Sequence, residues 1–132
     1  MEKESKIILL ADDDQDDQEL LREAFLITAP GAILNTVSFG KEVLDYLRNA
    51  GDENLPALII LDYNMPDLNG AEVLQKLYAD ARYQHIPTVI WSTSDATLYK
   101  ELCEQHGARE YFHKPHKFED ILELTRQMMR YC

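Results

Sequence analysis

The chain has 132 residues and a hydrophobic content of 45%, which fits one globular domain with a core that needs no covalent or metal cross-links. It contains no apolar run long enough to span a membrane and no stretch that reads as a signal peptide. We therefore expect a cytoplasmic protein. The formal charge of −11 repels nucleic-acid phosphates and anionic lipids, so direct binding to nucleic acid or to a membrane is not expected.

Short apolar runs rich in β-formers alternate along the chain with longer amphipathic segments. In chain order, strands are predicted at residues 7–11, 32–38, 57–61, 88–91 and 109–113, and helices at 15–28, 41–49, 70–82, 95–106 and 117–131. This alternation predicts an α/β fold, a parallel sheet with helices on both faces. The first, third and fourth strands are apolar on both faces, as central strands are, whereas the second alternates with polar residues and is expected at an edge.

The stretch "LLADDDQDDQELL" places five aspartates directly after the first strand. Asp14 is predicted to be the N-cap of the first helix, Asp16 to lie in its first turn, and Asp17 to stand in the position of a capping-box acid. Asp12 and Asp13 are not needed for capping. They lie at the carboxyl end of the first strand, and helix capping does not explain why two acids stand there.

A third acid ends the third strand, in "ALIILDYNMPDLNG", where Asp62 follows the apolar run. Ligands of open α/β sheets bind beyond the carboxyl ends of the strands, so Asp12, Asp13 and Asp62 converge if the first and third strands are neighbours. Two carboxylates about 5 Å apart repel by roughly 3 kcal/mol at an effective dielectric near 20. The set therefore predicts a hard cation, Mg²⁺ (or Mn²⁺), that also bridges to a phosphate. The alternative is that Asp62 only begins a turn.

The last two strands also end in polar residues, in "TVIWSTSD" and "EYFHKPHKF". Ser92 is the first hydroxyl after the fourth strand, and Ser94 is better placed to cap the following helix. Lys114 follows the fifth strand, and its ammonium could reach the acids as a point charge. The bond from Lys114 to Pro115 is a candidate for the cis form, which X-Pro bonds adopt in about 5–6% of cases.

Taken in order, "LLADDD", "LIILDYNMPDLNG", "IPTVIWSTS" and "EYFHKP" resemble the receiver domain of bacterial two-component response regulators, over residues 6–129. The resemblance implies a flavodoxin-like, doubly wound (βα)5 fold with a five-stranded parallel sheet in the order 2-1-3-4-5. It implies one receiver domain over residues 1–132, which we expect to be stand-alone. In such domains the bond before the proline that corresponds to Pro115 is usually cis.

The resemblance also assigns roles to the polar residues at the strand ends: a phosphoacceptor with two catalytic partners, a metal-binding set and a switch pair. The phosphoacceptor is Asp62, with Lys114 and Ser92 as its catalytic partners. The metal-binding set is Asp13, Asp62, the Asn64 backbone carbonyl and, through a water, Asp12. The switch pair is Ser92 and Tyr111.

The implied function is that of a phosphoacceptor response regulator in a two-component phosphorelay. A sensor histidine kinase or histidine phosphotransfer protein would supply the phosphoryl group, and the face of the fourth helix, fifth strand and fifth helix would switch to bind a downstream protein. A phosphorylation-linked dimer is compatible with this function, and no enzyme activity is expected.

An alternative is a Mg²⁺-dependent aspartyl-phosphate phosphatase or phosphotransferase of a small molecule, but Asn64 stands where a second catalytic aspartate is needed. A flavin carrier is disfavoured because "DDDQDD" would repel its phosphate.

Overall fold

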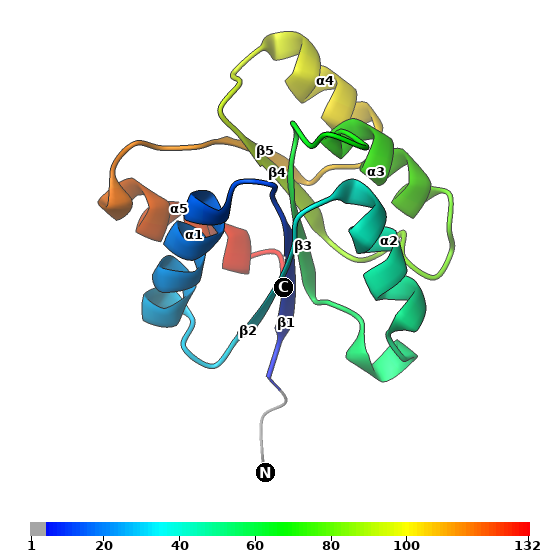
Figure 1. Cartoon of the computed structure of the whole chain (residues 1–132), viewed down its shortest axis with the longest axis horizontal. Coiled ribbons are helices and arrows are strands. Elements are labelled where there is room, and N and C mark those ends of the chain that lie inside the picture. Colours follow the sequence, from blue (N-terminus) through cyan, green and yellow to red (C-terminus); the bar gives the residue numbers. More distant parts are fainter. Residues whose placement is uncertain (1–4) are drawn as a thin grey trace.

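The computed structural model describes residues 5–132 and contains a parallel sheet of five strands between two layers of helices (Figure 1). The strands are β1 (Ile7–Ala11), β2 (Ile33–Val37), β3 (Leu58–Asp62), β4 (Thr88–Ser92) and β5 (Glu110–His113). The helices are α1 (Gln15–Thr28), α2 (Gly40–Asn49), α3 (Gly70–Tyr78), α4 (Thr97–Gln105) and α5 (Phe118–Met129), with a 3-10 turn at Asp52–Asn54. The strand order β2-β1-β3-β4-β5 confirms the predicted flavodoxin-like fold and the edge position of β2.

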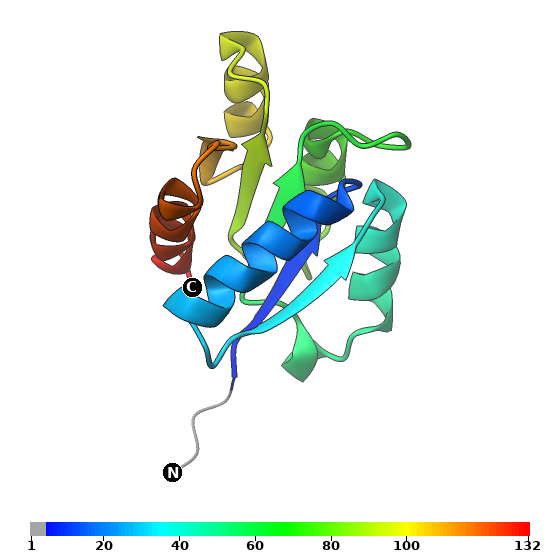
Figure 2. The same cartoon turned by 60° about the vertical axis from the view of Figure 1, so that its left-hand side comes forward.

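Alternate side chains of each strand face opposite helix layers, which buries both faces of the sheet. On one face Ile8 and Leu10 of β1 pack with α1 and α5, and on the other Leu9 and Ala11 pack with α2 and α3. Figures 1 and 2 show α1 and α5 on one side of the sheet and α2, α3 and α4 on the other. No helix within residues 5–132 has the length and apolar character needed to cross a lipid bilayer.

Helix α3 ends at Tyr78, four residues before its predicted end at residue 82. The Asp80 carboxylate accepts a hydrogen bond from the Arg82 N–H over 2.9 Å and closes a turn there, a local bond that competes with helix continuation. The Arg82 guanidinium then reaches back to the Asp52 carboxylate at 2.8 Å. Local side-chain bonding thus ends a helix whose apolar pattern continues.

The start of α4 also differs from the prediction, because the helix begins at Thr97 and its N-cap is Ala96. Ser94 is not the N-cap, and that prediction is wrong: its hydroxyl accepts from the Ala96 N–H over 3.3 Å in the loop before the helix. The other end matches expectation. Gly107 follows α4 with a φ of 102°, a conformation that glycine adopts without steric cost and that helix ends commonly use.

The strand register sets the position of the functional groups. Ala11 pairs with Leu61, Asp62 with Trp91 and Ser92 with His113, so the carboxyl ends of four strands lie at the same edge of the sheet. Polar residues that follow these pairs are therefore brought together at that edge.

Candidate functional site

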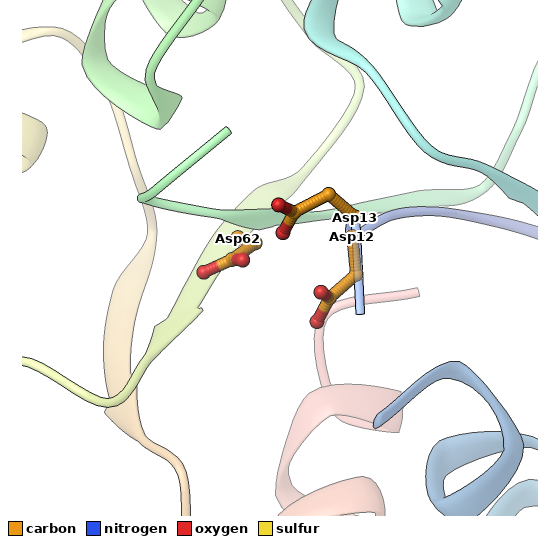
Figure 3. A group of neighbouring side chains, drawn as sticks. All are labelled: Asp12, Asp13 and Asp62. Carbon is orange, nitrogen blue, oxygen red and sulfur yellow. The ribbon is translucent and has the colours of Figure 1, made fainter. Parts of the chain in front are cut away.

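Three aspartates meet at the carboxyl ends of β1 and β3 (Figure 3). Each of Asp12, Asp13 and Asp62 offers a carboxylate oxygen within 4.8 Å of the others. Asp12 is 0% exposed and Asp62 is 5% exposed, whereas Asp13 is open to solvent. The convergence that the sequence predicted is confirmed, and so is the neighbour relation of β1 and β3 on which it depended.

Burial makes the charged form of these acids unfavourable. The pKa of Asp62 is raised to about 7, chiefly by burial and also by the charge of Asp12, while the charge of Lys114 opposes the rise. Burial likewise raises the pKa of Asp12, against the nearby Lys114 charge. A divalent cation would relieve both effects, and the oxygen-only donor set fits Mg²⁺ or Mn²⁺.

The Lys114 side chain lies among these acids and is 8% exposed. Its Nζ donates to Asp12 Oδ2 at 2.9 Å and to Asp17 Oδ2 at 2.8 Å, and lies 3.6 Å from Asp62 Oδ2. Burial alone would lower the pKa of the lysine. The hydrogen bond to Asp17 and the charges of Asp12 and Asp62 outweigh burial and raise the pKa, so the group is an ammonium ion. The expected approach of Lys114 to the acids is observed.

The peptide bond between Lys114 and Pro115 is trans, since residues 5–132 contain no cis peptide bond. The cis form that the resemblance implied is therefore wrong for this structure. The lysine is directed into the pocket by other contacts: its backbone N–H donates to the Ser92 carbonyl over 2.7 Å, and its ammonium is held by carboxylates.

The acids of the first helical turn behave only partly as predicted. Asp14 is the N-cap, and its carboxylate accepts from the N–H groups of Asp16 at 2.9 Å and Asp17 at 3.1 Å. The prediction that Asp17 completes a capping box is wrong, because the Asp14 N–H donates instead to Asp12 Oδ1 at 2.9 Å. The Asp17 carboxylate is left free to bind Lys114. Sequence reasoning missed Asp17 as a pocket residue, because a helix-start acid has a sufficient local explanation.

Ser92 and Tyr111, the predicted switch pair, both contact Ser94 in the loop between β4 and α4. The buried Ser92 Oγ accepts from the Ser94 N–H at 3.1 Å, and the Tyr111 hydroxyl donates to the Ser94 carbonyl at 2.7 Å. Lys100 of α4 lies 6.0 Å from the Tyr111 ring centroid. The two side chains therefore bond to the same residue of this loop, Ser92 to its N–H and Tyr111 to its carbonyl.

The loop after Asp62 folds back against the end of β3. The Asn64 N–H donates to Asp62 Oδ1 at 3.3 Å, and the Gly70 N–H donates to the Tyr63 carbonyl at 2.9 Å. A Cβ at Gly70 would lie 3.1 Å from the Asp62 carbonyl, so glycine permits this close approach. Tyr63 stacks on Tyr99 of α4 with ring centroids 4.3 Å apart. The residue after Asp62 thus contacts α4, the helix whose Lys100 lies near the Tyr111 ring.

A parallel sheet in this order, with three acids and a lysine at its carboxyl edge, is the arrangement of a receiver domain. The chain matches the response regulator receiver domain family over residues 8–126 and belongs to that family. It is therefore the receiver domain of a two-component response regulator.

Relatives of the chain occur among plants and archaea. The two-component response regulator ARR8 of Arabidopsis thaliana is 32% identical, over 98% of this chain and 64% of ARR8. The probable methanogenesis regulatory protein FilR2 of Methanothrix harundinacea (strain 6Ac) is 30% identical, over 95% of this chain and 82% of FilR2. The chain spans less than two thirds of the length of ARR8, and 62% of that of ARR15 from Arabidopsis thaliana.

Solved structures of response regulators have the same fold. The crystal structure of the phosphorylated cyanobacterial phytochrome response regulator RcpA superposes with a TM-score of 0.86 at 28% identity, over 97% of this chain and 94% of that one. The crystal structure of the Mn(2+)-bound form of response regulator Rcp1 gives a TM-score of 0.81 at 26% identity, over 92% and 90% of the two chains.

Proposed function

We propose that this receiver accepts a phosphoryl group on Asp62 from the phosphohistidine of a sensor histidine kinase or a histidine phosphotransfer protein. The observation that carries the proposal is the buried Asp62 carboxylate, with the Lys114 ammonium 3.6 Å from its Oδ2 and two further acids beside it. Receiver domains of this family act with histidine kinases or phosphotransfer proteins.

Transfer requires positioned charge more than covalent activation of the carboxylate. An Asp62 carboxylate oxygen forms a bond to phosphorus as the P–N bond of the donor breaks, and the donor imidazole leaves with the bonding electron pair. Lys114, whose Nζ lies 3.6 Å from Asp62 Oδ2, would contact the phosphoryl oxygens. Its charge also lowers the pKa of Asp62, against the effect of burial. The Ser92 hydroxyl at the end of β4 is proposed, with Asp62 and Lys114, as the third catalytic group.

The proposed metal ligands are Asp13, Asp62 and the Asn64 backbone carbonyl, with Asp12 acting through a water. Bound Mg²⁺ (or Mn²⁺) would neutralise the acids and the phosphoryl oxygens during transfer. The close approach of three oxygen donors and the raised pKa values of the two buried acids support this set. The Asn64 N–H bond to Asp62 brings the backbone of Asn64 to the same place.

Mg²⁺ should raise the melting temperature of the wild type, because it binds only the folded state. At a Mg²⁺ concentration a hundred times the dissociation constant, the free energy of unfolding rises by about 2.7 kcal/mol. Asp13→Ala should lose most of this response and melt higher than the wild type without metal, since one repelling charge is gone. Thermal unfolding with and without Mg²⁺ measures both effects. Asp95→Ala, which removes an exposed acid after β4, is the control. A full Mg²⁺ response in Asp13→Ala would exclude Asp13 as a ligand.

Phosphorylation would switch the face of α4, β5 and α5 through Ser92 and Tyr111. Both side chains are bonded to Ser94, so a movement of the Ser92 hydroxyl toward the phosphoryl group would release a contact that Tyr111 shares. Shifting a population from 1:99 to 99:1 takes about 5.5 kcal/mol, more than the roughly 1.5–3 kcal/mol of one hydrogen bond to a charged group. Lys114 and the metal are expected to contribute the remainder.

Ser92→Ala should therefore still bind beryllofluoride with Mg²⁺, but with smaller NMR chemical-shift changes at Tyr111 and along α4 than the wild type. Thr93→Ala removes the exposed neighbouring hydroxyl and should respond as the wild type does. If Ser92→Ala gives the full wild-type pattern, or if only Thr93→Ala is impaired, the coupled switch is assigned to the wrong hydroxyl.

Incubation with acetyl phosphate and Mg²⁺, followed by intact-mass measurement, tests the proposed function. The wild type should gain one phosphoryl group, lose it on treatment with hydroxylamine, which cleaves acyl phosphates, and gain none in excess chelator. A phosphatase of small molecules would instead release phosphate from a panel of phosphate esters without a lasting adduct.

We further infer that the receiver acts in the cytoplasm on a downstream protein, and that residues 1–132 form one receiver domain. The two cysteines support a reducing compartment, since Cys103 and Cys132 are both free thiols. The charge of −11 opposes binding to nucleic acid or to anionic lipid. A dimer that forms on phosphorylation is compatible with this function.

A further inference from the structure

The shortest ion pair of Lys114 is with an acid that the proposed transfer does not use. Its Nζ lies 2.8 Å from Asp17 Oδ2 and 2.9 Å from Asp12 Oδ2, but 3.6 Å from the acceptor, Asp62. An ammonium group has three N–H donors, and two of them are engaged by Asp12 and Asp17. The lysine is thus held on the α1 side of the pocket.

The backbone around the start of α1 makes this contact available. The carboxylate of Asp14 caps the helix, and the Asp14 N–H is satisfied by Asp12 Oδ1 at 2.9 Å, so Asp17 is not required by the cap. The Asp17 side chain is 24% exposed and the Lys114 side chain 8%, which leaves their ion pair partly shielded from water. A shielded pair with good geometry resists separation more than a surface pair does.

From this geometry we propose that Asp17 is a positioning residue that restrains Lys114 in the unphosphorylated receiver. The ammonium lies 2.8 Å from Asp17 Oδ2 and 3.6 Å from Asp62 Oδ2, so a movement toward a phosphoryl group on Asp62 would lengthen its bond to Asp17, and the cost of that separation opposes the phosphorylated state. Asp17 would then set how readily the receiver accepts a phosphoryl group and how long it stays switched. The inference rests on the proposed function, because it assigns to Lys114 the same phosphoryl contact.

The test compares Asp17→Asn with Asp16→Asn. Both substitutions remove one negative charge from the first turn of α1, but the exposed Asp16 makes no side-chain contact with Lys114 among the described residues. Affinity for beryllofluoride in saturating Mg²⁺ is measured from amide NMR resonances of the full chain. Asp17→Asn should bind about fivefold more tightly than the wild type, and Asp16→Asn within about twofold of it. Equal affinities of the two variants, or weaker binding by Asp17→Asn, would overturn the proposal.

Two further variants separate positioning from a merely structural role. Asp17→Glu keeps a carboxylate within reach of Lys114 and should bind within about twofold of the wild type, whereas Asp17→Ser removes the charge and should match Asp17→Asn. Tight binding by Asp17→Glu would contradict restraint by the ion pair. If the wild type itself binds no beryllofluoride and takes no phosphoryl group from acetyl phosphate, the proposed function fails; if it does both and Asp17→Asn equals Asp16→Asn, only the restraint fails.

Discussion

Asp62→Asn should take up no phosphoryl group from acetyl phosphate and Mg²⁺, while the wild type gains one. An amide has no anionic oxygen to attack phosphorus, and neither of the two acids grouped with Asp62 is placed to substitute. Asp12 is fully buried, with one oxygen bonded to the Asp14 N–H and the other to Lys114. Asp13 is exposed and is the proposed direct metal ligand. Intact-mass measurement after a short incubation gives the result directly.

The matched control for this loss is Asp95→Asn, which converts an exposed aspartate in the loop after β4. It should be labelled like the wild type, because its carboxylate is neither buried nor part of the three-acid group. Labelling of Asp62→Asn at the wild-type rate would remove Asp62 from the acceptor role. Labelling of Asp62→Asn at Asp12 or Asp13, found by peptide mapping, would instead show that a neighbouring acid can substitute for Asp62.

The fold was predictable because its main determinants are local. Apolar runs of strand length alternate with amphipathic segments of helix length, and right-handed crossovers leave few arrangements of a parallel sheet. The polar alternation of β2 marked it as an edge strand, and the structure places it there. The pocket acids were predictable for the same reason, since Asp12 and Asp62 follow neighbouring strands and the register brings strand ends together.

Features that depend on contacts between distant segments were not predictable in this way. The bond between Asp17 and Lys114 joins residues 97 positions apart, and nothing near Asp17 in the sequence distinguishes it from an acid that stabilises a helix start. The capping-box role predicted for Asp17 was wrong because Asp12 Oδ1, not Asp17, accepts the hydrogen bond from the Asp14 N–H. The end of α3 was missed because the Asp80 turn and the Arg82 contacts outweigh a continuing apolar pattern.

Asp12 joins the structural and chemical parts of the pocket. Its Oδ1 fixes the start of α1 through the Asp14 N–H, and its Oδ2 binds Lys114. The turn that begins α1 and the position of the lysine are therefore coupled through one buried carboxylate. A change of charge at Asp62 would act on the Lys114 ammonium, which is paired with Asp12 and with Asp17 in the first turn of α1.

Lys114→Met should lower the free energy of unfolding of the metal-free receiver by about 3 kcal/mol at pH 8. Removing one partner of a buried ion pair typically costs 3–5 kcal/mol, because the charge that remains is buried without compensation. Here Asp12, Asp17 and Asp62 would all lose their cation, while methionine keeps most of the side-chain volume. Urea unfolding in a chelator measures the loss. Lys117→Met, which removes an exposed lysine at the start of α5, should change stability little.

The loss should depend on pH, with a sign that the pKa shifts determine. Asp62 has a pKa of about 7 in the folded receiver against 3.8 ordinarily, and that of Asp12 is also raised. The folded state therefore holds protons that the unfolded chain has released, so stability falls as pH rises from about 4 through 7. Because Lys114→Met removes the charge that opposes these shifts, its deficit should be largest at pH 8 and smaller at pH 5. Saturating Mg²⁺ should also reduce the deficit at pH 8, since a cation again compensates the acids. An equal loss at both pH values, unaffected by Mg²⁺, would mean that Lys114 stabilises the fold by packing rather than by its charge.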